Sequence, residues 1–214
     1  MLNLLTKIMK KSQNLTKVIL KIKRLCDNKQ INEWYLMNRV PFYFMRHAET
    51  DHNAYRIYND VEDVDLNITG ISQAKKIQNV FRHLSIPTVC TSPLLRARRT
   101  KEIALQNKVY EDVVVEGFRE CPGMLWKLFL ASETRELLEN EWEEVNTFIQ
   151  ATKLALINAL ELPGPLLIIA HGGTYWALTH MLNIKGNKKI DNCSPVYISP
   201  HGSEDWKSEP IFHV

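Results

Sequence analysis

Residues 41–50 read Pro-Phe-Tyr-Phe-Met-Arg-His-Ala-Glu-Thr, and this stretch gives the first indication of the fold. Its apolar part, Pro41–Met45, ends abruptly in Arg46 and His47. A short apolar run bounded by polar residues is typical of a buried strand. In α/β sheets, ligands bind beyond the carboxyl ends of such strands. We therefore predict a strand that delivers Arg46 and His47 to a ligand site.

The rest of the chain alternates short apolar runs with helical patterns. Further strand candidates are Thr88–Thr91, Val113–Val115, Leu166–Ala170, Val196–Ser199 and Pro210–His213. Helices are expected over Thr69–His83, over Leu137–Leu160 and over Tyr175–Leu182. Another helix is expected after the strand Thr88–Thr91, and it should end at about Ala104. Strands that alternate with helices predict a mainly parallel sheet with helices on both faces. The predicted fold is an α/β protein, a three-layer α/β/α sandwich.

The N-terminal segment differs from the rest of the chain in charge. Residues 1–40 hold nine Lys and Arg against two acidic residues, a balance of +7, so the net charge of +3 leaves −4 for residues 41–214. The main domain is therefore not expected to bind nucleic acid. We divide the chain into a basic extension, residues 1–36, and one domain, residues 37–214, which is long enough to bury a substantial core.

Within the extension, Ile8, Leu15, Ile19 and Ile22 recur at spacings near three and four, and lysines fill most of the other face. This is the pattern of a basic amphipathic helix. Its interpretations stay open: a membrane-surface anchor, an organelle transit peptide, an arm for an acidic partner, or an extension without a role of its own. We favour the last interpretation. It covers the case in which translation begins at Met37 and residues 1–36 lie upstream of the true start.

The four cysteines are far apart and contain no Cys-x-x-Cys pair, so neither a zinc site nor a disulfide framework is predicted. No apolar run approaches the roughly 18–20 residues of a membrane span, and lysines interrupt any secretory-type apolar core. We expect a cytoplasmic protein, with organelle targeting by residues 1–36 as the alternative. The sequence does not indicate an oligomeric state.

Three polar clusters directly follow strand candidates. They are Arg46–Thr50 with Asn53, Ser92–Thr100, and His171–Gly173. If their strands are neighbours, two histidines and at least two arginines meet in one cationic pocket. Guanidinium groups match phosphate oxygens with paired hydrogen bonds. The pattern therefore predicts a site for a phosphoryl group.

The same residue types can perform catalysis on a phosphoryl group. A neutral imidazole can attack phosphorus and form a phosphohistidine, which divides the reaction into two easier steps. Nearby cations would keep the imidazole neutral and would also neutralise charge on the transferring group. A proton donor for the leaving oxygen is still required, and a carboxyl group with a raised pKa would serve.

Four motifs, in order, resemble those of the histidine phosphatase (phosphoglycerate mutase-like) superfamily over about residues 40–200. They are Arg46–Thr50, Leu66–Gly70 with Gln73-Ala74, Ser92–Leu94 with Arg96-Ala97 and Thr100, and His171-Gly172. One such motif is weak evidence, whereas four in order at compatible spacing are specific. The resemblance implies an α/β fold and phosphoryl-transfer chemistry.

The resemblance also implies a role for each matching residue. His47 corresponds to the phosphorylated nucleophile, and His171 corresponds to the second pocket histidine, which stabilises the transferred phosphate. Arg46 and Arg96 correspond to the phosphate-binding arginines. Glu120 corresponds to the usual proton donor.

Three further positions have weaker counterparts. Asn53 corresponds to a position that often helps to bind phosphate. Gly172, which is predicted to bind substrate, and Gly173 let the backbone approach closely beside His171. Asn192 resembles a late polar residue near the pocket. Ser92, followed by a proline, is interpreted as the cap of a helix. The other histidines lack a motif and are interpreted as ordinary residues: His52, His83, His180, His201 and His213.

The chain departs from the family pattern in two places. Ala48 stands where Gly is usual, and its methyl group is expected to narrow the pocket. After Glu120 the family often reads Gly-x-Trp-x-Gly. Here Trp126 fits that spacing, but Gly123 is one place early and Lys127 replaces the usual acid.

We expect hydrolysis of a small phosphorylated metabolite. Only about 50 residues separate Glu120 from His171, whereas mutases that resemble this family carry longer insertions over the pocket. Mutase-type phosphoryl transfer is the first alternative, and a non-catalytic phosphate-binding regulatory module is the second. No carboxylate cluster resembles a two-metal site, so we expect neither a metal nor another cofactor.

Overall fold

The computed structural model describes residues 37–57, 63–132, 136, 138–186 and 189–211. The basic helix expected within residues 1–36 lies outside the described residues. None of the helices in the described part combines the length and the apolar composition that a transmembrane span requires.

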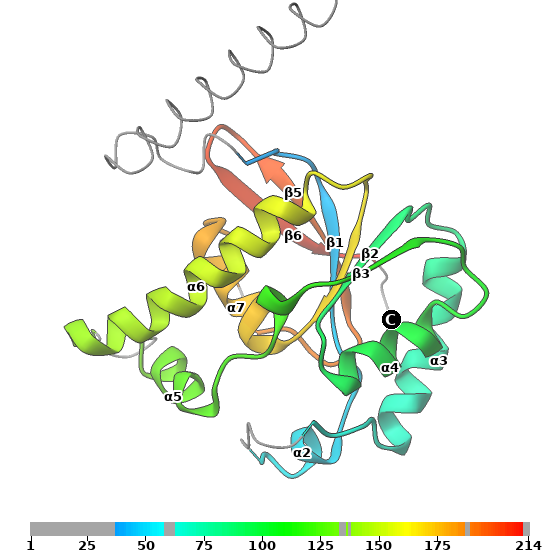
Figure 1. The fold of residues 1–214 in the computed structure, drawn as a ribbon, viewed down its shortest axis with the longest axis horizontal. Helices are drawn as coiled ribbons and strands as arrows, with labels where there is room; N and C mark the ends of the chain where they lie inside the picture. Colours follow the sequence, from blue (N-terminus) through cyan, green and yellow to red (C-terminus); the bar gives the residue numbers. More distant parts are fainter. Residues whose placement is uncertain (1–36, 58–62, 133–135, 137, 187–188, 212–214) are drawn as a thin grey trace, which may run out of the picture. The chain divides into compact units, whose positions relative to one another are not determined.

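One mixed sheet contains all the strands in the described residues, in the order β3-β2-β4-β1-β5-β6 (Figure 1). The strands are β1 (Phe42–Arg46), β2 (Thr88–Thr91), β3 (Glu111–Val114), β4 (Leu167–Ala170), β5 (Pro195–His201) and β6 (Asp205–Pro210). The first four in sheet order are parallel, and β5 and β6 are antiparallel additions at one edge. The predicted, mainly parallel sheet is confirmed.

Helices cover both faces of this sheet, as Figure 1 shows. On one face lie α3 (Ile68–Arg82) and α4 (Leu95–Ala104). On the other lie α5 (Gly123–Ser132), α6 (Glu139–Ala159) and α7 (Gly172–Met181), with a short 3₁₀ helix, η2 (Glu116–Phe118), before α5. A single helical turn, α2 (Asp51–Ala54), follows β1. The three-layer α/β/α sandwich is confirmed.

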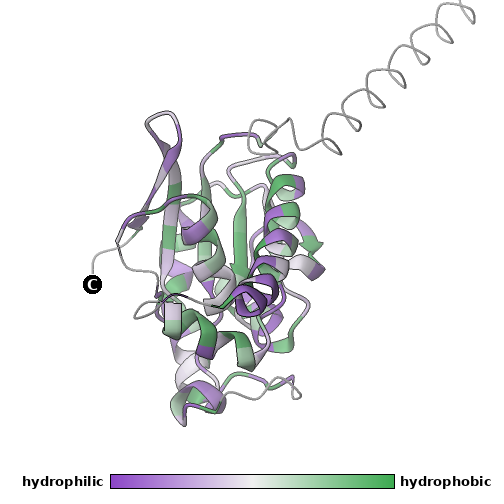
Figure 2. Cartoon of the chain, turned by 90° about the vertical axis from the view of Figure 1, so that its left-hand side faces the viewer, coloured by the Kyte–Doolittle hydropathy of each residue, from purple (hydrophilic) through white to green (hydrophobic). Residues whose placement is uncertain are grey.

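The core follows from the alternation of side chains along the strands. Met45 of β1 belongs to the hydrophobic cluster under α3 and α4, together with Phe81 and Ile169. Its neighbour Phe44 points to the opposite face, where its ring lies 5.4 Å from that of Tyr175 in α7. Figure 2 shows the hydrophobic colouring concentrated on the central strands and on the inner sides of the helices.

Strand β3 begins two residues before the predicted Val113, the short helices α2 and η2 were not predicted, and two larger elements also differ from the predictions. The last strand is Asp205–Pro210 rather than Pro210–His213. It pairs with β5 through a tight turn at Gly202, which adopts a positive φ of 63°. The buried side chain that ties it to the core is Trp206, whose ring lies 5.9 Å from Phe42. Helix α5 was not predicted, because its segment had been interpreted only against the family pattern around Glu120.

The strand order places the three polar clusters at one edge of the sheet. Strand β4 lies between β2 and β1, so the carboxyl ends of these three parallel strands are adjacent. The backbone ladder continues one residue past each strand: the His47 N–H donates to the Ala170 carbonyl, and the Ser92 N–H donates to the Ile169 carbonyl. His47, Ser92 and His171 therefore emerge side by side.

Candidate active site

The His47 ring is fully enclosed and held by its own loop. Its Nδ1 lies 2.7 Å from the carbonyl oxygen of Ala48. A carbonyl oxygen can only accept a hydrogen bond, so Nδ1 carries the hydrogen, and Nε2 of the neutral ring keeps its lone pair. Burial, followed by the charges of Arg96 and Arg46, lowers the pKa of His47 well below its usual 6.5. The ring is therefore neutral at physiological pH and presents a nucleophilic nitrogen.

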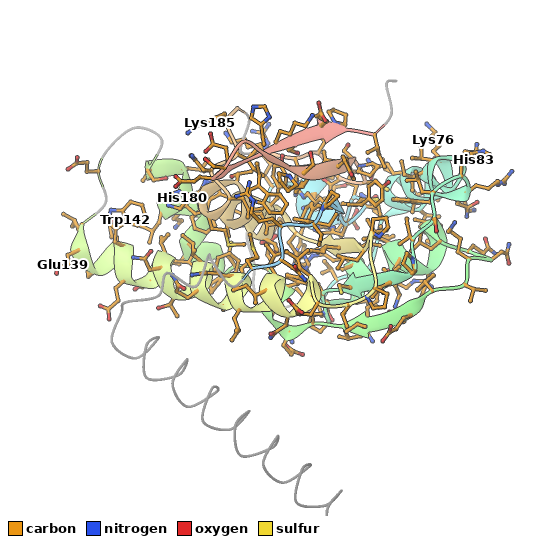
Figure 3. All side chains as sticks on the ribbon, turned by 90° about the horizontal axis from the view of Figure 1, so that it is seen from above. Lys76, His83, Glu139, Trp142, His180 and Lys185 are labelled. Atoms are coloured by element: carbon orange, nitrogen blue, oxygen red, sulfur yellow. The ribbon has the colours of Figure 1, made fainter. Side chains whose placement is uncertain are left out.

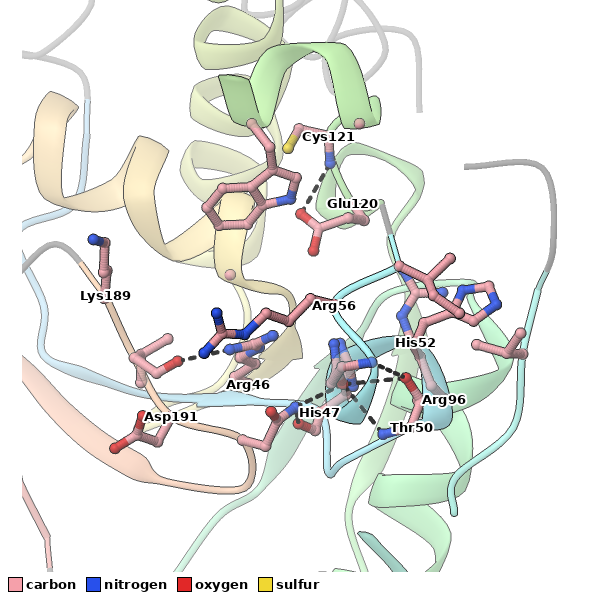
Figure 4. A pocket seen from close by; sticks show the side chains of 18 of the residues that line it. Arg46, His47, Thr50, His52, Arg56, Arg96, Glu120, Cys121, Lys189 and Asp191 are labelled. Atoms are coloured by element: carbon pink, nitrogen blue, oxygen red, sulfur yellow. Dashed lines mark hydrogen bonds between the residues drawn. The ribbon is translucent and has the colours of Figure 1, made fainter. Parts of the chain in front are cut away.

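Two guanidinium groups flank this nitrogen. Arg46 ends β1, and its Nη1 donates to the Ile190 carbonyl at 3.1 Å. Arg96 comes from the first turn of α4, and its side chain is only 13% exposed. Burial lowers the pKa of Arg96, although an arginine remains charged at neutral pH. Figure 4 shows both side chains beside His47 on one wall of the pocket.

A polar network orients Asn53 on the same wall. Its Oδ1 accepts from the Thr50 N–H at 3.2 Å, from the Thr50 hydroxyl at 3.2 Å and from Asn192 Nδ2 at 3.1 Å. Asn192 Nδ2 also donates to the His47 carbonyl at 2.9 Å. Because Oδ1 accepts these bonds, the Asn53 amide nitrogen is the group left to donate. Asn192, the loosest of the sequence matches, thus connects Asn53 with the backbone of His47.

Glu120 faces these groups from the loop between η2 and α5. One carboxylate oxygen, Oε1, accepts from the backbone N–H groups of Cys121 at 3.0 Å and Gly173 at 2.9 Å. The other oxygen, Oε2, lies 4.0 Å from Nδ1 of His171. Burial raises the pKa of Glu120, and the charges of Arg96 and Arg46 and the two backbone hydrogen bonds oppose that rise. A carboxyl group with a raised pKa suits proton transfer.

Both glycines after His171 lie in tight packing, which is closest at Gly173. A Cβ atom on Gly173 would lie 2.5 Å from Oε1 of Glu120 and 2.5 Å from the Cys121 sulfur. A Cβ atom on Gly172 would lie 3.0 Å from the Trp126 ring. Gly172 also lines the pocket. The glycines therefore let Glu120 and Trp126 close against the start of α7, which sequence reasoning had not anticipated.

His171 is fully buried at the N-cap of α7, and its ring centroid lies 5.2 Å from that of His47. Its Nε2 lies 2.6 Å from the Ser92 hydroxyl. Burial, then the charges of Arg96, His47, Arg46 and Arg119, lower the pKa of His171 well below 6.5. His171 is therefore also neutral at physiological pH.

These residues surround one cavity of about 550 Å³. The lining includes six of the seven site residues predicted from sequence: Arg46, His47, Asn53, Arg96, Glu120 and Gly172. The seventh, His171, lies directly behind them. The structure thus brings all seven together. The outer wall contains residues that sequence reasoning did not assign to the site: His52, Arg56, Ile57, Trp126, Leu130 and Lys189.

Figure 4 shows the Arg56 side chain extending across this cavity toward Arg46. Of the other histidines interpreted as ordinary residues, His83, His180 and His201 are not among those that line it, and His213 lies outside the described residues. Figure 3 shows His83 at one end of the domain and His180 beside Trp142 at the other. The ring of His180 stacks on Trp176 at a centroid distance of 5.3 Å.

Two sequence interpretations are wrong. The Ala48 methyl group does not narrow the pocket, because it is fully buried in the hydrophobic cluster under α3. The Ala48 N–H donates to the Thr100 hydroxyl at 2.9 Å and anchors the loop to α4. Ser92 is not the cap of α4, since that position is Leu94. Its hydroxyl contacts His171 instead.

Three side chains of the site could in principle bind a metal ion. Ligand atoms of His47, Glu120 and His171 lie within 4.8 Å of one another. Two buried or half-buried guanidinium groups, Arg46 and Arg96, adjoin the same space, and their charge opposes a cation there. The arrangement therefore favours an anion.

Comparison with known proteins agrees with this geometry. The chain is 31% identical over 140 residues to PhoE of Bacillus subtilis, an uncharacterized phosphatase, with 63% of this chain and 72% of that protein aligned. It is 28% identical to the agropine synthesis reductase of Rhizobium rhizogenes over 78% of this chain but only 41% of that protein. A phosphoserine phosphatase from Entamoeba histolytica shares the fold, with a TM-score of 0.59 and 17% identity over 74% of this chain and 89% of that one.

The model of one protein family matches residues 42–209, from the start of β1 into β6. That span contains every residue placed around the cavity. By this match and by its fold, the chain belongs to the histidine phosphatase superfamily (branch 1).

Proposed function

We propose that this protein is a phosphatase that hydrolyses a small phosphate monoester by way of a phosphohistidine on His47. The observation that carries the proposal is the Nδ1 hydrogen bond of His47 to the Ala48 carbonyl, which leaves Nε2 as the available lone pair between Arg46 and Arg96. A relative, PhoE, is named as a phosphatase, which supports the same class of reaction.

The reaction divides into two steps. In the first, the Nε2 lone pair of His47 attacks phosphorus, the bond to the ester oxygen breaks, and Oε2 of a protonated Glu120 gives its proton to the departing alcohol. In the second, the Glu120 carboxylate takes a proton from water as the water oxygen attacks the phosphohistidine. The P–N bond breaks, inorganic phosphate leaves, and both side chains return to their starting states.

The surrounding residues stabilise the transferring group. Its developing charge lies on three oxygens, and Arg46, Arg96, His171 and the Asn53 amide provide donors on several sides. We therefore propose that activity needs no metal ion. The rest of the lining combines two cations, Arg56 and Lys189, with the carboxylate of Asp191 and several apolar side chains. A cavity of about 550 Å³ fits a small metabolite better than an extended polymer.

A panel of phosphate esters, assayed with and without exhaustive EDTA treatment, tests the function. We expect turnover of at least one small ester, unchanged by EDTA. Loss of activity on EDTA treatment, with recovery in Mg²⁺ or Mn²⁺, would refute metal independence. Transfer of phosphate to an added alcohol rather than to water would favour the mutase alternative, and binding of phosphate without turnover would favour a regulatory module.

A rapid quench with radiolabelled substrate tests the intermediate. The wild-type protein should carry an acid-labile label, and His47→Ala should carry none and lose several orders of magnitude in turnover. His83→Ala is the matched control, because His83 is an exposed histidine that is not among the residues lining the cavity. Full labelling of His47→Ala would refute the assignment of the nucleophile.

A further inference from the structure

The contact between Ser92 and His171 decides which nitrogen of His171 carries a hydrogen. Ser92 Oγ lies 2.6 Å from Nε2 of the ring, and both residues are fully buried. A serine hydroxyl and a ring nitrogen can exchange the roles of donor and acceptor. The direction of this bond must therefore come from the other partners of the two groups.

On the serine side, one of the two lone pairs is occupied. The backbone N–H of Leu94 donates to Ser92 Oγ at 3.3 Å. Within the described residues, the hydrogen bonds of this hydroxyl are those to Leu94 and His171. If the ring donated to the serine, the buried hydroxyl hydrogen would lack an acceptor among the described residues, which is costly. If the serine donates, the hydroxyl uses its hydrogen toward His171 and one lone pair toward Leu94.

On the histidine side, Nδ1 is buried and has no hydrogen-bond partner among the described residues. It lies 4.0 Å from Oε2 of Glu120, and ligand atoms of His47, Glu120 and His171 all lie within 4.8 Å of one another. The proposed function places the phosphoryl group beside these atoms. A bare lone pair there would repel phosphate oxygens, whereas an N–H would donate to them. Donation by Ser92 to Nε2 leaves the neutral ring with its hydrogen on Nδ1. The partners of the Ser92 hydroxyl and the surroundings of His171 Nδ1 therefore favour the same arrangement, in which Ser92 donates to Nε2 and Nδ1 carries the hydrogen.

We propose that Ser92 is a positioning residue that fixes His171 in the Nδ1–H form, so that His171 donates a hydrogen bond to the transferring phosphoryl group. This inference rests on the proposed phosphatase function for its catalytic consequence, but the position of the hydrogen is a property of the resting protein. The two histidines of the site then share one tautomer and use opposite atoms. His47 presents the bare Nε2, and His171 presents Nδ1–H.

Nitrogen-15 NMR of the full chain, labelled at histidine, reads the tautomer directly and without substrate. In the wild type at neutral pH, we expect the His171 hydrogen on Nδ1 and none on Nε2. In Ser92→Ala the ring loses its donor, so part or all of the population should move its hydrogen to Nε2. Ser92→Thr keeps a hydroxyl and should restore the wild-type pattern.

A buried hydroxyl elsewhere on α7 provides the control for general damage. Thr179 donates to the Trp176 carbonyl at 2.8 Å and does not line the cavity. Thr179→Ala should leave the His171 signals and turnover unchanged. Ser92→Ala should lower kcat/KM by about 10²–10³, the range for loss of one donor to a developing oxyanion.

The two kinds of readout separate this inference from the proposed function. A His171 hydrogen on Nε2 in the wild type, or on Nδ1 alone in Ser92→Ala, would overturn the role of Ser92 even if the protein is an active phosphatase. The predicted tautomers in a protein that hydrolyses no ester would support the role of Ser92 and refute the proposed function. The wild-type spectrum suffices for the first test if Ser92→Ala does not fold.

Discussion

Replacement of Glu120 by Gln separates proton transfer from the packing of the same side chain. The amide oxygen of Gln can still accept the N–H groups of Cys121 and Gly173, which Oε1 of Glu120 accepts at 3.0 and 2.9 Å. The NH₂ group takes the place of Oε2, and it can neither deliver a proton to a leaving oxygen nor take one from water. Glu120→Gln should therefore keep the fold and the packing around residue 120 and lose the group that transfers the proton.

The size of the effect should depend on the leaving group. General acid catalysis contributes about 10²–10⁴ in rate, or about 3–5 kcal/mol of barrier. An alkyl phosphate needs that proton, so its kcat/KM should fall by about this factor in Glu120→Gln. A nitrophenyl phosphate leaves as a stable anion and should lose much less. The ratio kcat/KM is the correct measure, because it reports the first step and is independent of the later attack of water.

Glu116→Gln is the matched control. Its carboxylate is exposed and pairs with Arg119 at 3.2 Å, so turnover of neither ester should be affected.

Thermal unfolding provides a second check. Burial raises the pKa of Glu120, so ionisation of this group at neutral pH works against folding, and Gln removes that cost. The midpoint of Glu120→Gln should not fall below that of the wild type. Equal slowing of both esters would refute the role of Glu120 as the acid.

Three further predictions use other features of the chain. Gly173→Ala should reduce both activity and stability, the latter by about 1–3 kcal/mol, because its Cβ atom would lie 2.5 Å from Glu120; denaturant unfolding and turnover measure this. As the pH is lowered, kcat/KM should begin to fall only well below pH 6.5, because the lowered pKa of His47 keeps its ring neutral there. A fall that begins above pH 6.5 would contradict this prediction. Deletion of residues 1–36 should leave turnover of small esters nearly unchanged.

Much of the sheet could be predicted because its strands are short, apolar and followed by polar residues. The run Leu166–Ala170 is a clear example, and it lies at the centre of the sheet as β4 (Leu167–Ala170). Strand β6 was misplaced because Asp205–Pro210 is mostly polar. Its one buried side chain is Trp206, and the strand is held besides by its pairing with β5 and by the contact of the Ser208 hydroxyl with the Tyr175 hydroxyl at 3.0 Å. An edge strand with one buried side chain has too weak a pattern to locate from sequence alone.

The site residues were predictable where they belong to a motif, and their packing was not. Nothing local to His171 indicates that the two glycines after it must accommodate Trp126 and Glu120, which lie about 50 residues earlier in the chain. Likewise, the Ala48 methyl group was assigned to the pocket because of its neighbours in sequence. Its actual direction depends on the loop geometry after β1, which turns it into the cluster under α3.

The two histidines of the candidate site show most clearly what sequence cannot decide. Both follow a strand, both are buried, and both are neutral at physiological pH for the same physical reasons. What distinguishes them is the partner of one ring nitrogen. His47 donates from Nδ1 to the carbonyl of the next residue, whereas Nε2 of His171 meets a serine that is 79 positions away in the chain. A carbonyl forces a hydrogen onto Nδ1 and frees Nε2 for attack. A serine that donates to Nε2 also leaves the hydrogen on Nδ1, but turns that hydrogen toward the phosphate. The proposed roles, His47 as nucleophile and His171 as hydrogen-bond donor, thus follow from two contacts of the folded chain. One is local, between His47 and Ala48, and the other is distant in sequence, between His171 and Ser92.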